Sequence, residues 1–253
     1  MNSPEPSVRA RYGMVVDLDR CNGCGACVVA CAVENNVPPA AERASERTGI
    51  SWLNVQRLEG ASGRVAFLPM TCQQCEARTP CASVCPQNAV ELDGSSGIVG
   101  QVPVRCLGCR YCMVACPYHA RSFNWWDPEW PGSLVEMLNP AVSTRTRGVV
   151  EKCNFCVQRL QAARTRHAAT GGDPSVAPEY TPACVEACPA GALVFGDLAR
   201  PESEVSRLAR SPDAFRLLER LGTGAKVYYR TRRPWVRQAV ADAPAAGDGR
   251  THA

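Results

Sequence analysis

The stretch CNGCGACVVAC at residues 21–31 decides the fold class, because it places four cysteines in the order C-x2-C-x2-C-x3-C. This is the spacing of bacterial ferredoxins, in which three close cysteines bind one iron–sulfur cluster and the fourth reaches a neighbouring cluster. Two-residue gaps let the thiolates of one tight turn converge on adjacent corners of a cube, while backbone N–H groups face the sulfides. The stretch therefore predicts an iron–sulfur site.

Three further groups of cysteines follow, and the four groups together use all sixteen cysteines. The second group has a longer C-x5-C step, the third repeats the spacing of the first, and the fourth holds 27 residues between its two pairs. The groups are Cys21, Cys24, Cys27 and Cys31; Cys72, Cys75, Cys81 and Cys85; Cys106, Cys109, Cys112 and Cys116; and Cys153, Cys156, Cys184 and Cys188. Four complete groups predict four clusters.

Two other uses of sixteen thiols compete with this interpretation. Eight disulfides would need an oxidising compartment and are typical of short secreted chains. The first thirteen residues, MNSPEPSVRARYG, have neither the apolar segment nor the paired arginines of an export leader, so we expect none. Zinc ribbons use two separated C-x2-C pairs, whereas the first and third groups place three cysteines within seven residues. Iron–sulfur clusters are favoured, and a zinc-stabilised scaffold is the structural alternative.

Composition points to a core that large side chains alone do not fill. The 253 residues are 45% hydrophobic and 21% charged, as in globular proteins. They include only five Phe, five Trp and six Tyr. The net charge of +4 comes without a basic stripe interleaved with aromatics, so we expect no nucleic-acid partner. No stretch approaches the roughly 18–20 apolar residues of a membrane-spanning helix.

Local patterns predict short elements around the cysteine groups. Alternating apolar residues and Gly-containing turns indicate hairpins, and Ser211-Pro212 has the cap and first-position residues of a helix start. The predicted elements are a strand over 14–18, a polar loop over 33–50, a hairpin over 51–68 turning at 60–63, a hairpin over 89–104 turning at Asp93-Gly94, a helix from 157 to the Gly171-Gly172 pair, a strand over 191–198, a helix from 211 to Gly222 and a strand over 226–229.

The cysteine groups also suggest how the chain is organised. The second and third groups are only twenty residues apart, as in a single dicluster ferredoxin. The simplest arrangement is nested, with groups two and three inside and groups one and four paired around them. Spacing alone also permits a sequential arrangement, one with two and three with four. The predicted fold class is α+β, with two nested dicluster ferredoxin-like units carrying hairpin and loop insertions.

This arrangement gives seven expected segments. They are a flexible N-terminus (1–11), the first half of the outer unit with a hairpin insertion (12–71), the inner unit (72–118), a Trp- and Pro-rich connection (119–152), the second half of the outer unit (153–198), a C-terminal helix, strand and basic docking arm (199–238), and a disordered tail (239–253).

Several motifs of this chain resemble a known family. They are YGMVVDLDRCNGCGACVVAC, FLPMTCQQCEARTPCASVCP, RCLGCRYCMVACPYHARSFNWWDPEWP, and GVVEKCNFC with CVEACPAGAL. The chain resembles, over about residues 12–237, the four-cluster 4Fe–4S electron-transfer subunits of membrane-bound respiratory oxidoreductases, such as the beta subunits of polysulfide and dimethyl sulfoxide reductases. The branch that it resembles most contains the iron–sulfur subunits of menaquinone reductase and alternative complex III.

The resemblance implies a nested ligand map. One cluster would take Cys21, Cys24, Cys27 and Cys188, and its partner Cys31, Cys153, Cys156 and Cys184. The inner pair would be held by Cys72, Cys75, Cys81 and Cys116, and by Cys85, Cys106, Cys109 and Cys112. Some relatives lack the cysteine that matches Cys109 and hold a three-iron cluster there. Because Cys109 is present here, we expect four 4Fe–4S clusters, a departure from the alternative complex III pattern. In relatives the third-group cluster lies at the membrane end, near the quinone site.

The family implies electron transfer rather than catalysis by this chain. The three histidines, His119, His167 and His252, lack metal-ligand spacing, so we assign no catalytic residue. The implied partners are a molybdopterin-type catalytic subunit or a multihaem cytochrome and a polytopic quinone-binding membrane subunit, in a hetero-oligomer. The implied place is peripheral on the cell membrane, at its periplasmic face or alternatively its cytoplasmic face. The alternative function is a soluble cytoplasmic ferredoxin-like subunit of a hydrogenase or formate dehydrogenase.

Two features outside the cysteine groups have two interpretations each. Trp125, Trp126 and Trp130 would either pack over the cluster core or dock a partner. The segment KVYYRTRRPWVR is rich in cations, and we expect a partner-binding arm rather than a solvated tail. Lys152, beside Cys153, would be either a surface charge or a charge that raises the potential of its cluster.

Overall fold

The computed structural model describes residues 10–39, 49–173 and 176–242. Most of the predicted flexible N-terminus, part of the 33–50 loop and residues 243–253 of the predicted tail lie outside these ranges. Ala10 and Arg11 do not belong to a flexible segment. Ala10 is buried and its N–H donates to Ser95, and Arg11 pairs with Glu76.

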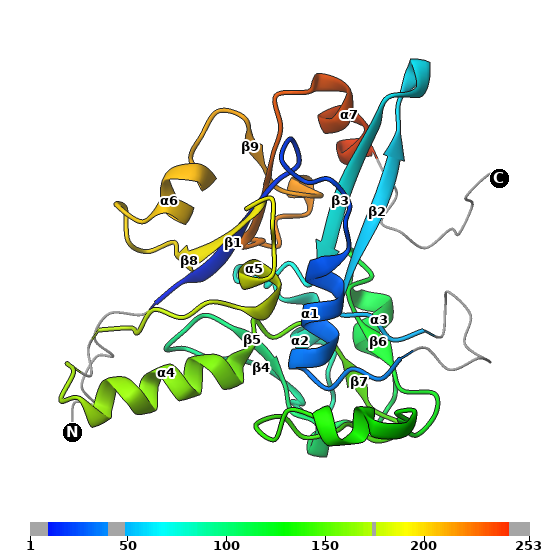
Figure 1. The fold of residues 1–253 in the computed structure, drawn as a ribbon, viewed down its shortest axis with the longest axis vertical. Coiled ribbons are helices and arrows are strands. Elements are labelled where there is room, and N and C mark those ends of the chain that lie inside the picture. Colours follow the sequence, from blue (N-terminus) through cyan, green and yellow to red (C-terminus); the bar gives the residue numbers. More distant parts are fainter. Residues whose placement is uncertain (1–9, 40–48, 174–175, 243–253) are drawn as a thin grey trace.

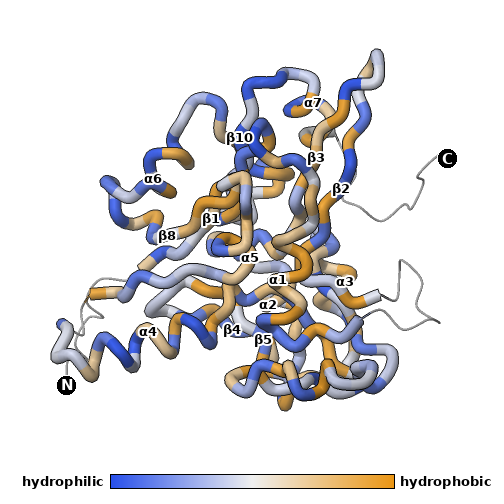
Figure 2. Tube along the Cα trace, in the orientation of Figure 1, coloured by the Kyte–Doolittle hydropathy of each residue, from blue (hydrophilic) through white to orange (hydrophobic). Residues whose placement is uncertain are grey.

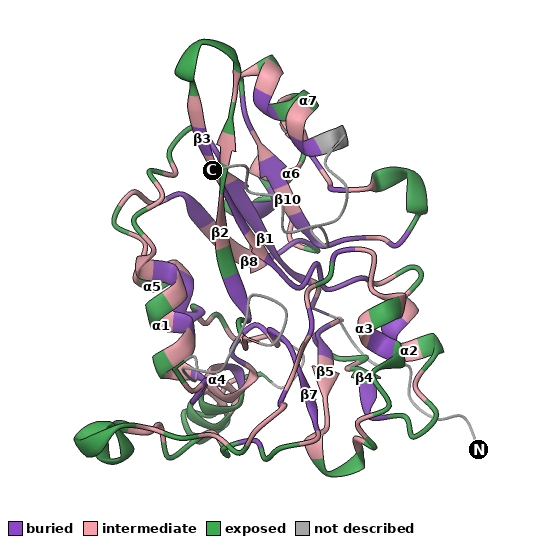
Figure 3. Cartoon of the chain, turned by 90° about the vertical axis from the view of Figure 1, so that its right-hand side faces the viewer, coloured by how far each residue is buried: buried purple, intermediate pink, exposed green. Residues whose placement is uncertain are grey.

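A four-stranded sheet joins the two ends of the described chain (Figure 1). Its strands, in spatial order, are β8 (Leu193–Asp197), β1 (Tyr12–Asp17), β10 (Val227–Arg230) and β9 (Ala214–Phe215). β1 is antiparallel to β8 and parallel to β10, with Val15 opposite Tyr228. Apolar residues colour β1 and β8, and burial extends along both central strands (Figures 2 and 3). The strands predicted over 14–18, 191–198 and 226–229 are thus confirmed, with small shifts of their ends.

The first predicted hairpin is a long ribbon that projects from the sheet end of the molecule (Figure 1). It consists of β2 (Leu53–Glu59), a 3-10 turn η1 (Ala61–Gly63) and β3 (Val65–Thr71). The second predicted hairpin is β4 (Val90–Leu92) paired with β5 (Val99–Gln101) and followed by η2 (Pro103–Arg105). Both hairpins are confirmed.

Four short helices, each carrying at least one cysteine of a group, pack in pairs. They are α1 (Ala26–Glu34), α2 (Pro80–Ser83), α3 (Tyr111–Ala115) and α5 (Ala183–Glu186). α1 packs against α5, and α2 packs against α3. The two pairs lie on opposite sides of the molecule (Figure 3). Groups one and four are therefore paired around groups two and three, so the α+β fold is nested rather than sequential.

The connection between the inner unit and the fourth group crosses the base of the molecule. It contains η3 (Gly132–Met137) and ends in β7 (Val150–Glu151), which pairs with β6 (Ser122–Phe123). α4 (Val157–Ala169) then begins directly after Cys156, as predicted, and Gly171 adopts a φ of +71° just beyond it. No described helix has the length and apolar character needed to cross a membrane.

The helix predicted from Ser211 to Gly222 is wrong. The helix of this region is α6 (Glu204–Ala209), and the Ser203 side chain caps it by accepting from the N–H of Ser206 at 3.2 Å. Ser211-Pro212 lies in the turn that ends α6, because a residue before proline is disfavoured in helical conformation. The chain then forms β9 and the 3-10 turn η4 (Glu219–Leu221), which Gly222 ends with a φ of +61°.

The basic C-terminal segment is integrated into the fold and is not an extended arm, and its binding to a partner stays a prediction. Lys226 and Tyr229 are fully buried in and beside β10. Arg230 pairs with Asp213 at 2.8 Å, and Arg233 pairs with Asp19 at 2.8 Å. The predicted disordered tail is also wrong at its start, since α7 (Pro234–Asp242) extends through the first four residues of 239–253.

Candidate metal centres

The first predicted set of thiols lines one hollow of about 330 Å³. Cys21, Cys24, Cys27 and Cys188 all contribute to its wall. Gly23 has a φ of +76°, and a Cβ there would lie 2.5 Å from the ring of Phe67. The turn therefore requires glycine both for its backbone conformation and for the approach of β3. Burial, and then the Cys21 and Cys188 thiolates, raise the pKa of Cys27 to about 11.

The predicted inner set around the third group lines a second hollow of about 320 Å³. Its thiols are Cys85, Cys106, Cys109 and Cys112. Gly108 has a φ of +70°, and a Cβ there would lie 2.3 Å from the carbonyl oxygen of Gly148. Hence the loop before β7 closes against the third cysteine turn.

The other two predicted sets converge in the interior. Burial, followed by the thiolates of Cys153, Cys184 and Cys156, raises the pKa of Cys31 well above its usual value. Likewise burial and the neighbouring Cys72 thiolate raise the pKa of Cys75 to about 12, with Cys116 and Cys81 contributing further. Neutral thiols are thus favoured without metal, and cluster assembly must displace their protons.

Electrostatic interactions between thiols of different sets indicate a linear order of the sets. In addition to burial, the Cys27 thiolate of the first set raises the pKa of Cys184, and the Cys72 thiolate raises the pKa of Cys153. The Cys81 thiolate likewise raises the pKa of Cys112 in the third-group set. The series therefore runs from the Cys21 set through the Cys31 set and the Cys72 set to the Cys106 set.

Exposure changes along this series. All sixteen cysteines lie in the described part of the chain, and only Cys24 and Cys109 are exposed. Cys24 belongs to the first set and Cys109 to the last, whereas the Cys31 set is wholly buried. The exposed thiols therefore lie at the two ends of the series, and in its middle only Cys116 is partly exposed.

Three of the four groups end in the same local turn, read as Cys-Pro-x-x-Ala at residues 85–89, 116–120 and 188–192. The N–H of Ala89 donates to Cys85 Sγ at 3.2 Å, and that of Ala192 donates to Cys188 Sγ at 3.3 Å. A backbone hydrogen bond from Ala120 likewise lowers the pKa of Cys116, against a larger effect of burial. N–H donors of this kind stabilise negative charge on the thiolates.

The first group departs from this turn, and a side chain supplies its donor. Cys31 has no proline after it and lies inside α1, so the fourth residue beyond it, Asn35, follows at the helix end. Asn35 Nδ2 lies 3.8 Å from Cys31 Sγ and 3.7 Å from Cys156 Sγ. Asn35 is only 1% exposed. It is the amide that links two thiols of the buried Cys31 set.

Replacing Asn35 by leucine should therefore lower the reduction potential of the cluster in the Cys31 set. Losing a hydrogen bond of about 1 kcal/mol corresponds to a shift of about fivefold in the reduction equilibrium. EPR-monitored redox titration of the assembled protein measures this shift. Asn22→Leu, at an exposed amide of the first set that accepts from the N–H of Cys24, is the control and should leave this potential unchanged. An unaltered potential in Asn35→Leu would contradict the assignment.

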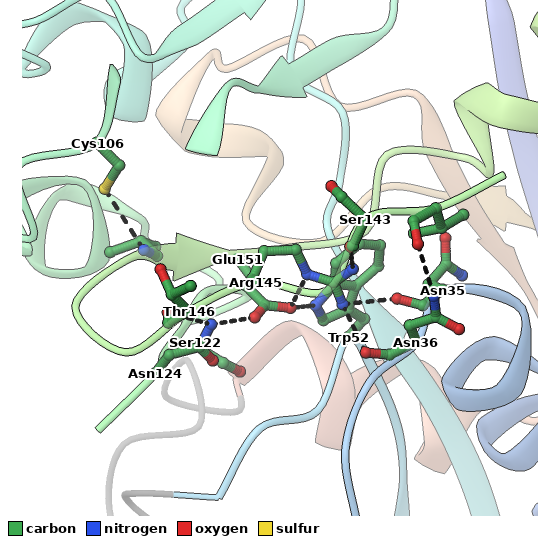
Figure 4. Close-up of polar contacts among 12 residues, drawn as sticks. Asn35, Asn36, Trp52, Cys106, Ser122, Asn124, Ser143, Arg145, Thr146 and Glu151 are labelled. Atoms are coloured by element: carbon green, nitrogen blue, oxygen red, sulfur yellow. Dashed lines mark hydrogen bonds and ion pairs between the residues drawn. The ribbon is translucent and has the colours of Figure 1, made fainter. Parts of the chain in front are cut away.

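A buried polar network binds the backbone of Asn35 (Figure 4). Arg145 Nη2 donates to the carbonyl oxygen of Asn35 at 2.6 Å. Arg145 Nε forms an ion pair of 2.9 Å with Glu151, and its guanidinium lies 5.0 Å from the centre of the Trp52 ring. Trp52 Nε1 and Asn124 Nδ2 both donate to the Glu151 carboxylate. The network joins the end of α1, the start of the hairpin and β7.

The structure shows the surroundings of two residues outside the cysteine groups, Trp125 and Lys152. Trp125 packs edge-on against Phe123, with ring centres 4.7 Å apart, and the Arg110 guanidinium lies 5.0 Å over its ring. Trp125 thus packs beside the third cysteine turn. Lys152 is not a surface charge, because it is 2% exposed and its Nζ donates to the carbonyl oxygen of Cys153 at 2.9 Å.

Neither described histidine side chain, that of His119 or of His167, forms a hydrogen bond with a thiol of the described residues. His119 is exposed, and the His167 ring contacts the Asp173 carbonyl oxygen at 2.9 Å. His252 lies outside the described residues. The sequence interpretation missed Asn35, Arg121 and the Arg145–Glu151 pair; a comparison of the fourth residue after each closing cysteine would have singled out Asn35.

Known protein families match this chain over its first three cysteine groups. Residues 20–89 and 64–130 each match a 4Fe-4S dicluster domain family. The iron-sulfur cluster-binding subunit of menaquinone reductase from Nitratidesulfovibrio vulgaris is 49% identical over 91% of this chain and 92% of its own length.

Two archaeal proteins show lower identity over similar coverage. Iron-sulfur subunit 1 of the Hdr-like menaquinol oxidoreductase from Archaeoglobus fulgidus is 39% identical over 90% of this chain and 87% of its own length. The iron-sulfur subunit of a putative dimethyl sulfoxide reductase from Halobacterium salinarum is 39% identical over 86% of this chain and 78% of its own length. The dicluster matches and the sixteen cysteines fit four 4Fe–4S clusters. The chain belongs to the family of four-cluster iron–sulfur electron-transfer subunits of respiratory oxidoreductases.

Proposed function

We propose that this chain conducts single electrons between two partner subunits, through four 4Fe–4S clusters held by the four thiol sets. The observation that carries the proposal is the exposure of Cys24 and Cys109 alone among the sixteen cysteines, one at each end of the series. When bound, each cluster supplies a one-electron site whose potential depends on hydrogen bonds to sulfur, net charge and solvent exposure. The protein excludes water from the middle of the path and opens its ends to partners.

The Cys109 end is the proposed face for a quinone-binding membrane subunit. Four large apolar side chains around this turn are exposed: Val104 (93%), Leu107 (66%), Tyr111 (64%) and Val114 (85%). Exposed apolar groups of this density are typical of protein interfaces. The two relatives named for menaquinone and menaquinol support a menaquinone-linked reaction.

The Cys24 end is the proposed face for the subunit at the other end of the electron path, a molybdopterin-type catalytic subunit or a multihaem cytochrome. Val29 and Val33 lie one helical turn apart on α1 and are 64% and 57% exposed. They give this end its own apolar surface, separate from that of the Cys109 end. We place the complex at the membrane, on its periplasmic face, as the family resemblance suggests.

Charged substitutions at the two ends test this division. Val114→Asp should reduce association with solubilised membrane subunits at least about tenfold, because a charge buried without a partner at an interface costs several kcal/mol. Val33→Asp is the matched control: it should leave membrane association intact and weaken the other partner. Both variants should keep their iron, since both side chains face solvent. Membrane association that is equal in the two variants would refute the assignment, and protease digestion of the chain in intact spheroplasts tests the periplasmic face.

A further inference from the structure

Arg121 is a buried cation between the third cysteine turn and β6. Arg121 is only 6% exposed. Nη1 donates to Gln101 Oε1 at 2.8 Å, and Nη2 is buried without a nitrogen or oxygen partner among the described residues. The guanidinium also interacts by hydrogen bonding with the thiols of Cys81 and Cys112. A guanidinium cannot lose its charge in a protein, so a permanent positive charge is enclosed at this place.

The neighbours of Arg121 come from both inner sets. Burial lowers the pKa of Arg121, but the thiolates of Cys81, Cys112 and Cys72 outweigh burial and raise it. Arg121 is in turn one of the groups that lower the pKa of Cys85, against the effect of burial and together with backbone N–H donors. Cys72 and Cys81 belong to one inner set and Cys85 and Cys112 to the other. One guanidinium therefore interacts electrostatically with thiols of both sets.

Carboxylates do not neutralise this charge in the described part of the chain. No ion pair of Arg121 with a described Asp or Glu lies within 4 Å. Arg145, the other buried arginine, is instead paired with Glu151 at 2.9 Å. A buried charge without a counter-ion is costly unless something negative faces it. The thiolate-bound clusters are the negative groups that this position offers.

We propose that Arg121 is a positioning charge shared by the two inner clusters, which raises both of their reduction potentials together. This inference rests on the proposed function. Each reduction adds one electron from a neighbouring cluster; no bond forms or breaks, and Arg121 keeps its proton. Because a single residue acts on both clusters, it moves their two potentials in the same direction and changes the driving force between them less than it changes either potential.

Removal of the charge tests the proposal in the assembled, cluster-loaded complex. Arg121→Gln should shift the reduction equilibrium of both inner clusters about tenfold toward the oxidised form, or about 59 mV for one electron. Arg121→Lys keeps a positive charge and should restore most of the shift. Arg105→Gln is the matched control, because Arg105 is half-exposed and paired with Glu91 beside the same cysteine group. EPR-monitored redox titration measures all four clusters, and the outer two should not move.

A second variant decides the matter if Arg121→Gln does not assemble. Gln101→Glu keeps Arg121 and places a carboxylate where the amide now accepts from it. The decisive measurement is the reduction potential of the cluster in the Cys72 set, which should fall. The cluster of the Cys106 set is less suitable, because Gln101 itself lines that hollow. Full iron content with unchanged inner potentials would overturn the role of Arg121 and leave electron transfer intact. A wild-type complex without four clusters would instead overturn the proposed function.

Discussion

Replacing Cys184 by alanine is expected to remove one cluster and to separate the two ends of the electron path. Cys184 is buried in α5, and its thiol converges with those of Cys153, Cys156 and Cys31. This set lies second in the series, between the exposed Cys24 end and the inner unit. Iron content should therefore fall from about sixteen to about twelve atoms per chain, and quinone-linked turnover of the complex should be lost.

A comparison with Cys109→Ala distinguishes loss of a middle cluster from loss of an end cluster. Electrons supplied by the partner subunit bound at the Cys24 end should still reduce the three remaining clusters of Cys109→Ala. In Cys184→Ala the same partner should reduce the first cluster but reach the inner pair slowly. Glu186→Gln, an exposed neighbour on α5, is the control and should behave as wild type. Sixteen iron atoms in Cys184→Ala would contradict the predicted ligand set.

The parts of the fold that could be predicted depend on short-range sequence patterns. Cysteine spacing and the Gly-containing turns predicted both hairpins, the strands and the helix after Cys156, because these patterns act within a few residues. Spacing left nested and sequential pairing open, since it does not determine which helices pack together. The packing of α1 on α5 settles that question in the structure.

The errors occur where tertiary pairing or a competing cap overrides a local signal. Ser211-Pro212 has the residues of a helix start, yet Ser203 caps the actual helix and the following residues pair with β10. The cation-rich composition of the segment KVYYRTRRPWVR predicted an arm that projects to bind a partner. Arg230 and Arg233 of this segment, however, find Asp213 and Asp19, which lie 17 and 214 residues away in sequence. Such partners cannot be read from one sequence.

The same limit applies to the groups that surround the clusters. The thiol sets followed from motif spacing and family resemblance, but Arg121 lies outside every cysteine run. Its role depends on interactions with thiols of two sets and on the lack of a described carboxylate beside it. Asn35 was in principle detectable, because it stands where the other closing cysteines are followed by Ala after a Cys-Pro turn.

Breaking the buried ion pair behind Asn35 is expected to destabilise the folded chain strongly. Glu151→Ala would leave Arg145 buried without its partner, and would also remove the acceptor of Trp52 and Asn124. Removing one partner of a buried pair typically costs about 3–5 kcal/mol, whereas replacing both by apolar groups often costs little. Glu151→Gln, which keeps an oxygen that can accept from Trp52 and Asn124, should be closer to wild type than Glu151→Ala.

Cluster bleaching in denaturant is the suitable measurement, because unfolding of a metal-loaded protein is not a reversible two-state process. Glu151→Ala should bleach much faster than wild type, and the first cluster lost should be that of the Cys31 set, whose Asn35 is held by Arg145. Arg57→Ala, which breaks an exposed pair with Glu59 on the hairpin, is the control; exposed pairs contribute only about 0–1 kcal/mol. If Glu151→Ala and Arg57→Ala bleached at the same rate, the network would not hold the end of α1 in place.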